Sequence, residues 1–76
     1  MNFTKGSAND RTATTDDGRQ YIIRFVGGGL AYFVLIAMGR KVGQFHTFDA
    51  AVAEAKANDL LYRFRNQDVT IEEVGA

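Results

Sequence analysis

The sequence lacks several residue types on which small proteins depend. Its 76 residues include no cysteine, no proline and no tryptophan, and only one histidine. The absence of cysteine excludes disulfides and thiolate zinc sites. A single histidine excludes histidine-rich metal sites and most catalytic triads. We therefore expect a non-enzymatic protein without metal or cofactor, in reducing cytoplasmic surroundings.

The chain also has no excess of charge of either sign. Nine basic residues balance nine acidic ones, so the formal net charge is zero. General nucleic-acid binders gain most of their affinity by neutralising phosphates with basic side chains. The composition therefore does not favour nucleic acid as the partner.

No stretch is apolar enough and long enough to cross a membrane. The most apolar run extends from Tyr21 to Met38, but Arg24 and the triplet Gly27–Gly29 interrupt it. A spanning helix needs roughly 20 consecutive apolar residues. We expect no membrane association, and we expect residues 1–76 to form one domain in which residues 1–10 are a loose N-terminal segment.

The apolar run has the composition of two strands. Residues 19–26 and 30–37 are rich in β-branched and aromatic residues, and the glycine triplet between them predicts a turn. Residues 11–15 precede an Asp-Asp-Gly turn and predict a polar edge strand. Residues 38–41 predict a further turn that leads into a short strand over residues 41–46.

The stretch after Thr47 predicts the one helix of the chain. Thr47 is a good N-cap residue, and Asp49 places a negative charge in the first turn. Two sets of residues recur at helical spacing. The first set is Ala50, Ala53, Ala57, Leu60, Leu61 and Phe64, and the second is Phe48, Val52 and Ala55.

We expect this helix to cover residues 48–65 and a final strand to follow at Val69 to Val74. The predicted fold is α+β, with an antiparallel sheet of four to five strands and one helix packed on one face. The predicted order is β-β-β-β-α-β.

Both faces of the central hairpin are apolar, whichever register it adopts. A two-residue loop at Gly27-Gly28 would place Phe25 opposite Leu30 and Tyr21 opposite Val34. Ile22, Val26, Phe33 and Leu35 would then share one face. A three-residue loop shifts this pairing by one residue. One helix covers only one face, so we expect the other to bind either a target protein or a second copy of the chain.

The stretch GRKVGQFHTFDAAVAEAKANDLLYRFRN, residues 39–66, resembles the AP2/ERF DNA-binding domain and its phage-endonuclease relatives. The matching pieces are Gly39-Arg40-Lys41, Phe45, Thr47-Phe48-Asp49 and Ala50-Ala51. The resemblance implies a sheet-plus-helix fold that reads DNA with arginines and tryptophans on the open sheet face. Here the corresponding face offers Ile22, Val26, Phe33 and Leu35, with Arg24 as its cation, so the resemblance does not extend to DNA reading.

In size and composition the chain is also similar to small phage anti-CRISPR proteins, which block host complexes by binding them. We therefore expect a protein-binding inhibitor, encoded by a phage or mobile element, that acts on a host nucleoprotein complex by steric occlusion and forms a homodimer. A nucleic-acid-binding accessory protein and a self-assembling structural phage protein are the alternatives. The expected partner-binding residues are Ile22, Arg24, Val26, Phe33, Leu35, Arg40, Lys41, Arg63 and Arg65.

Overall fold

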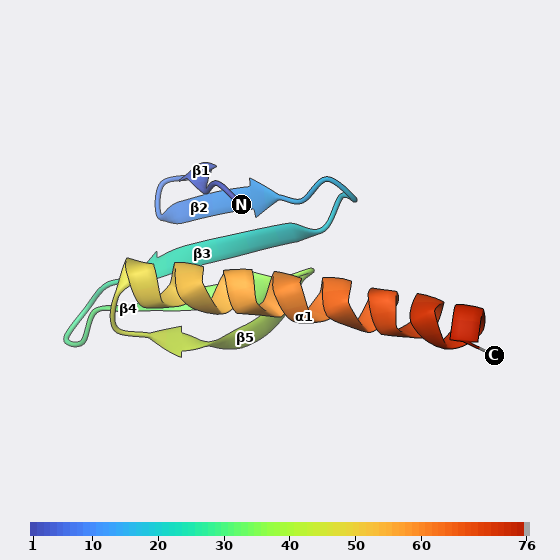
Figure 1. Ribbon diagram of the computed structural model, residues 1–76. Helices are drawn as coiled ribbons and strands as arrows, with labels where there is room; N and C mark the ends of the chain where they lie inside the picture. The colour runs from blue at the N-terminus through green and yellow to red at the C-terminus, as the bar shows by residue number, and fades with distance from the viewer. Residues whose placement is uncertain (76) are drawn as a thin grey trace.

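The protein folds as a five-stranded antiparallel sheet with one long helix on one face (Figure 1). The computed structural model describes the backbone of residues 1–75 and the side chains of residues 1–65. The strands follow one another in the sheet in chain order. They are β1 (Thr4–Lys5), β2 (Asp10–Thr14), β3 (Gln20–Val26), β4 (Tyr32–Ala37) and β5 (Arg40–Phe45), and the helix is α1 (Phe48–Gly75). The predicted α+β class is confirmed.

The hairpin β2–β3 forms at the predicted Asp-Asp-Gly turn. The Thr15 N–H donates to the Arg19 carbonyl at 2.9 Å, and the Gly18 N–H donates to the Thr15 carbonyl at 3.0 Å. Gly18 has a φ of 88°, a conformation that favours glycine. The hairpin β4–β5 turns through Met38 and Gly39, with φ angles of 52° and 81°. Positive φ at both central residues is typical of a two-residue hairpin loop that matches the strand twist.

The register of β3 and β4 differs from the predicted one. Phe25 pairs with Phe33, not Leu30, and Tyr21 pairs with Ala37. The connecting loop therefore has five residues, 27–31, of which three are glycines. The pairing is shifted by three residues. Because three is an odd number, the side chains of β4 that were expected on one face of the sheet lie on the other. The observed register places Ala37 beside the buried Tyr21 ring, where a larger neighbour would compete for the space under α1.

The first half of α1 packs on the face formed by the odd-numbered residues of β3 and β4. Ala51 and Ala55 are fully buried against it, and their small side chains let the helix approach the strands closely. The core beneath them is Tyr21, Ile23, Leu35 and Ala37, with Ala13 from β2. Thr47 is the N-cap, because its Oγ1 accepts a hydrogen bond from the Ala50 N–H at 3.1 Å.

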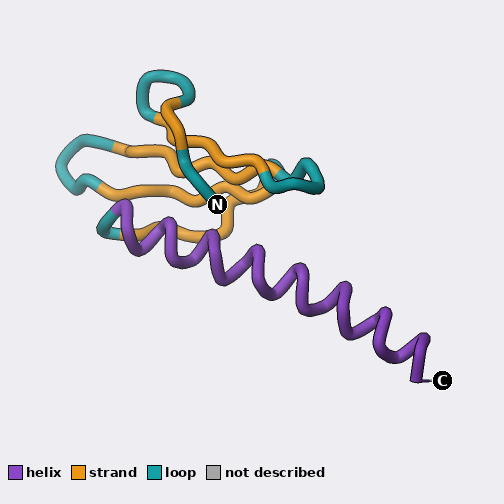
Figure 2. The backbone as a smooth tube through the Cα atoms, turned by 45° about the horizontal axis from the view of Figure 1, so that its top comes forward, coloured by secondary structure: helices purple, strands orange, loops and turns teal. Residues whose placement is uncertain are grey.

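The helix extends further than predicted, and the predicted strand at Val69 to Val74 is wrong. Residues 66–75 continue α1 to Gly75. Residues 49–74 contain neither proline nor glycine, so nothing in the sequence interrupts the backbone hydrogen bonding of the helix. The second half of α1 projects beyond the sheet, past the turns β2–β3 and β4–β5, and the molecule is 55 Å long but only 20 Å and 18 Å across (Figure 2).

The N-terminal segment, predicted to be loose, contributes a short strand. β1 pairs with the edge of β2, with Thr4 opposite Thr12. Phe3 lies beside Phe48 at the start of α1, with ring centroids 6.3 Å apart. Within the described residues, no helix is both long enough and apolar enough to cross a bilayer.

Candidate interaction surfaces

The sheet face opposite α1 is left without a covering element by the described part of the chain. Ile22 pairs with Ile36, Arg24 with Val34, and Val26 with Tyr32, which places all six side chains on this side of the sheet. We call this set the open sheet face. Its five apolar members are half-buried, shielded only by their neighbours within the sheet. A continuous apolar surface of this kind, made by two adjacent strands, is typical of a protein interface.

Arg24, the central cation of the open sheet face, is held in a bidentate ion pair. Its Nε and Nη2 donate to the two carboxylate oxygens of Asp10 at 2.9 Å and 3.1 Å. The Ser7 hydroxyl donates to the same carboxylate at 3.1 Å. The hydrogen bond from Arg24 lowers the pKa of Asp10, and the same bond raises the pKa of Arg24. The charge of Arg24 is thus compensated inside the molecule, which makes it a poor contact for phosphate.

The new register moves two predicted partner-binding residues to the other side of the sheet. Leu35 is fully buried under α1, so it is a core residue and cannot contact a partner. Phe33 also lies on the helix side, where its ring meets Phe48 with centroids 6.1 Å apart. The prediction that these two share the uncovered face is wrong. Ile22, Arg24 and Val26 do lie on that face.

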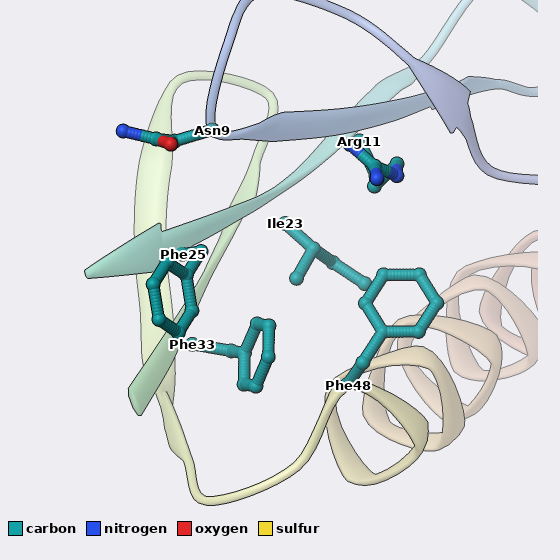
Figure 3. Close-up of a pocket in the computed structure, with 6 residues that line it drawn as sticks. All are labelled: Asn9, Arg11, Ile23, Phe25, Phe33 and Phe48. Carbon is teal, nitrogen blue, oxygen red and sulfur yellow. The ribbon is translucent and has the colours of Figure 1, made fainter. Parts of the chain in front are cut away.

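An aromatic pocket of about 390 Å³ opens on the helix side of the sheet, near the start of α1 (Figure 3). Its lining residues are Asn9, Arg11, Ile23, Phe25, Phe33 and Phe48. The rings of Phe25 and Phe33 lie side by side, with centroids 5.3 Å apart, and Phe25 is 40 % exposed. The volume lies at the small end of the range for ligand sites. Its mainly apolar lining is better suited to binding an apolar group than to catalysing a reaction.

The four basic residues that the sequence singles out lie in the region where α1 leaves the sheet. Arg40 and Lys41 begin β5, at the end of the sheet from which α1 projects (Figure 1). Arg63 and Arg65 lie on the projecting part of α1, and all four side chains are exposed. Arg63 donates to Asp59 one turn earlier, at 3.1 Å.

Arg19 forms a buried polar cluster that the sequence did not reveal. Its side chain is only 7 % exposed and donates to Asp17 at 3.1 Å, to the Tyr21 hydroxyl at 3.1 Å and to Asp59 at 2.6 Å. The guanidinium also lies over the Tyr62 ring, 3.9 Å from its centroid. The cluster therefore fixes the middle of α1 to the β2–β3 turn. In the sequence, the only sign of this cluster is that Asp59 and Tyr62 are three residues apart and therefore lie on one face of a helix.

The cluster shifts the acidity of its members. Burial by itself lowers the pKa of Arg19, but hydrogen bonds to Asp17 and Asp59 raise it above its ordinary value. Burial raises the pKa of Asp59. The hydrogen bonds and charges of Arg19 and Arg63 together lower it by more, so the pKa of Asp59 lies below its ordinary value. Burial also raises the pKa of Tyr21, whose hydroxyl donates to Asn58 at 2.9 Å.

The side of α1 that points away from the sheet carries a second apolar surface. Leu60, Leu61 and Phe64 are 68 %, 56 % and 57 % exposed. Exposed alanines precede them at helical spacing. We call the whole set the outer stripe, which consists of Ala50, Ala53, Ala57, Leu60, Leu61 and Phe64. Of the two helical repeats in the sequence, the one containing Phe48, Val52 and Ala55 faces the sheet.

His46 has no surroundings that point to catalysis. It is exposed and borders a pocket of about 310 Å³, whose other lining residues are Leu30, Ala31, Tyr32, Gln44 and Phe45. No carboxylate, serine or cysteine is among them. Within the described residues, no group of three or more histidine, cysteine, aspartate or glutamate side chains is placed to hold a metal ion.

Comparison of the chain with protein-family models, with curated proteins and with solved structures gave no match.

Proposed function

We propose that the protein is a non-enzymatic protein-binding module that binds a partner protein through the open sheet face. The proposal rests on the apolar composition and the uncovered position of this face. Ile22, Val26, Tyr32, Val34 and Ile36 form one apolar surface on adjacent strands, while α1 lies on the opposite side. In an ordinary two-layer α+β fold the sheet face away from the helix is polar, because it meets water.

The ion pair in the middle of this surface fits the same role. Arg24 is 51 % exposed, but its guanidinium is already bonded to Asp10. A partner therefore meets a compensated charge surrounded by apolar side chains, and burying that charge costs less than burying an unpaired one. The pair also fixes the position of a polar anchor within the apolar surface, which favours one orientation of the partner.

The proposed action is that of a small phage or mobile-element inhibitor, which blocks a host complex by occupying its surface. The short single-domain chain and the lack of a catalytic constellation among the described residues support an effect through binding. An occluding inhibitor should abolish binding of the host complex to its nucleic acid without changing the subunit composition of that complex. A gel-shift assay with the captured complex tests this step.

Capture from a bacterial lysate with matched variants tests the binding surface. Val34→Lys places a charge in the centre of the open sheet face and should abolish capture of the partner. Gln20→Lys adds the same charge to the same side of the sheet at the far end of β3 and should leave capture intact. Equal capture by wild type and Val34→Lys, with both proteins folded, contradicts the proposal.

Nucleic-acid binding is the second candidate, because two basic residues begin β5 and two more lie on α1 where the helix leaves the sheet. These residues are Arg40, Lys41, Arg63 and Arg65. It predicts a gel shift with duplex or single-stranded DNA at low salt, weakened by the double substitution Arg40→Ala, Lys41→Ala and lost steeply as salt rises. Absence of any shift at low salt excludes it.

A further inference from the structure

The outer stripe of α1 has the residue spacing of a helix–helix seam. Ala50, Ala53, Ala57, Leu60 and Phe64 follow one another at alternating intervals of three and four residues. This spacing keeps one line of a helix in continuous contact with a second helix. The line lies opposite Ala51 and Ala55, which are buried against the sheet, so it is free for a contact outside the molecule.

The projecting part of α1 needs such a contact. Beyond Asp59 the helix has no strand beneath it, yet it continues to Gly75 and exposes three large apolar side chains, Leu60, Leu61 and Phe64 (Figure 2). Helices in water gain most of their stability from packing an apolar face. A chain of this size that has no cysteine for disulfides also commonly gains stability by association with itself.

We propose that a second copy of the chain packs on the outer stripe, with the two α1 helices antiparallel. The stripe is small at its N-terminal half, with three alanines, and large at its C-terminal half, with two leucines and a phenylalanine. Antiparallel pairing centred on Ala57 sets Phe64 of one copy against Ala50 of the other. Large side chains then meet small ones on both sides of the central Ala57–Ala57 contact, so the bulk of the side chains is similar at the two ends of the seam.

The charges beside the stripe complement each other in this arrangement. Asp49 and Arg63 lie on the same flank of the stripe, fourteen residues apart. Antiparallel pairing centred on Ala57 brings Asp49 of each copy within two residues, about 3 Å along the helix axis, of the level of Arg63 of the other. A pair of long and short charged side chains can span this offset, so two such pairs form in the dimer. Arg63 uses its Nε for Asp59 within the chain, which leaves its terminal nitrogens for Asp49. Lys56 lies near the two-fold axis, where both long side chains can turn toward water.

The sheets do not obstruct this contact. In each copy the sheet packs on the side of α1 that carries Ala51 and Ala55, opposite the outer stripe, and lies beside the first half of the helix (Figure 2). In an antiparallel pair the two sheets therefore lie outside the helix pair, at its two ends. The open sheet face of each copy stays accessible. The dimer thus presents two copies of the proposed partner-binding surface, and bivalent attachment raises the overall affinity for a partner with repeated sites.

Sedimentation equilibrium over a wide concentration range tests the contact. Wild type should dimerise, and Ala57→Arg, which inserts a charged side chain at the centre of the seam, should be monomeric with its sheet intact by NMR. Val34→Lys, on the open sheet face, should dimerise like wild type. A monomeric wild type overturns the proposal. So does a dimer that Val34→Lys dissociates and Ala57→Arg does not.

Crosslinking determines the orientation, because the chain has no cysteine of its own. Ala57→Cys should form a disulfide-linked dimer readily, since the two sulfurs meet near the axis. Ala50→Cys should not, because antiparallel pairing separates the two copies of residue 50 by about 21 Å along the seam. Equally fast crosslinking of both variants overturns the antiparallel arrangement.

Exchanging the charges of Asp49 and Arg63 gives an independent test of the antiparallel dimer. Asp49→Lys and Arg63→Glu should each weaken the dimer roughly 2- to 30-fold, since each removes two exposed pairs. The double variant should recover most of the lost affinity. Additive weakening in the double variant contradicts the pairing of these two residues.

Discussion

At the scale of single residues, Arg19 is the side chain that joins the two layers of the fold. One guanidinium bonds Asp17 in the turn, Tyr21 in β3 and Asp59 in α1, and stacks on Tyr62. Removing it would leave the buried Tyr21 hydroxyl without its donor and would leave the partly buried Asp59 with only Arg63 as a partner. Apart from the spacing of Asp59 and Tyr62, the sequence could not reveal this cluster, because Arg19 and Asp59 are 40 positions apart.

Arg19→Met should therefore lower the free energy of unfolding by about 2–4 kcal/mol, because it removes a hydrogen-bond donor from buried and partly buried polar groups. Urea denaturation followed by circular dichroism measures this loss. Arg40→Met is the matched control, because Arg40 is an exposed arginine at the start of β5. Its effect should be much smaller. Equal losses in both variants would show that the Arg19 cluster does not join the layers.

The lowered pKa of Asp59 predicts how stability depends on pH. Its ordinary value is 3.8, and the folded protein holds the group below that value. The folded state therefore gains stability from Asp59 above pH 3.8 and loses it as the pH falls through the lowered pKa. Asp59→Asn should be less stable than wild type at neutral pH, and the difference should shrink at pH 3. An unchanged difference between the two pH values would contradict the assignment.

At the scale of the elements, local signals predicted the turns and the helix start, whereas packing decided the rest. The Asp-Gly turn and the Thr47 cap act within a few residues, so the sequence displays them. The β3–β4 register depends on which face of β4 fits under α1, and three loop glycines permit several loop lengths. For that reason Ile22, Arg24 and Val26 were placed on the correct face, while Phe33 and Leu35 were not.

The register has a direct energetic consequence. Leu35→Ala should destabilise the protein by about 2–5 kcal/mol, as expected for a fully buried leucine. Val34→Ala, the neighbouring residue on the open sheet face, should cost less than about 1.5 kcal/mol, because its side chain is only half-buried. Chemical denaturation of both variants compares them. A larger loss for Val34→Ala would mean that β4 presents its other face to α1.

The helix end shows a second limit of local reasoning. Val69, Thr70 and Ile71 are β-branched and therefore resemble a strand, yet α1 continues through them. A strand there would need an edge to pair with, and β-propensity alone does not supply one. Likewise, when one helix carries two apolar repeats, their spacing in the sequence does not show which repeat faces the sheet. Only the observed burial of Ala51 and Ala55 shows which side meets the sheet.

At the scale of the whole molecule, one helix on one face of a sheet leaves two apolar surfaces on opposite sides. The open sheet face lies on one side, and the outer stripe of α1 lies on the other. We assign the first to a partner protein and the second to another copy of the chain. Separate variants address each surface, so the two assignments can fail independently.

The most direct measurement places a photo-crosslinking amino acid at position 32, in the open sheet face, and irradiates the protein in a bacterial lysate. We expect a discrete crosslinked product with one protein, which disappears when Val34→Lys is added to the same chain. The same crosslinker at Glu54, on the exposed side of α1, should not give that product. No product from position 32, or the same product from both positions, would contradict partner binding through the open sheet face.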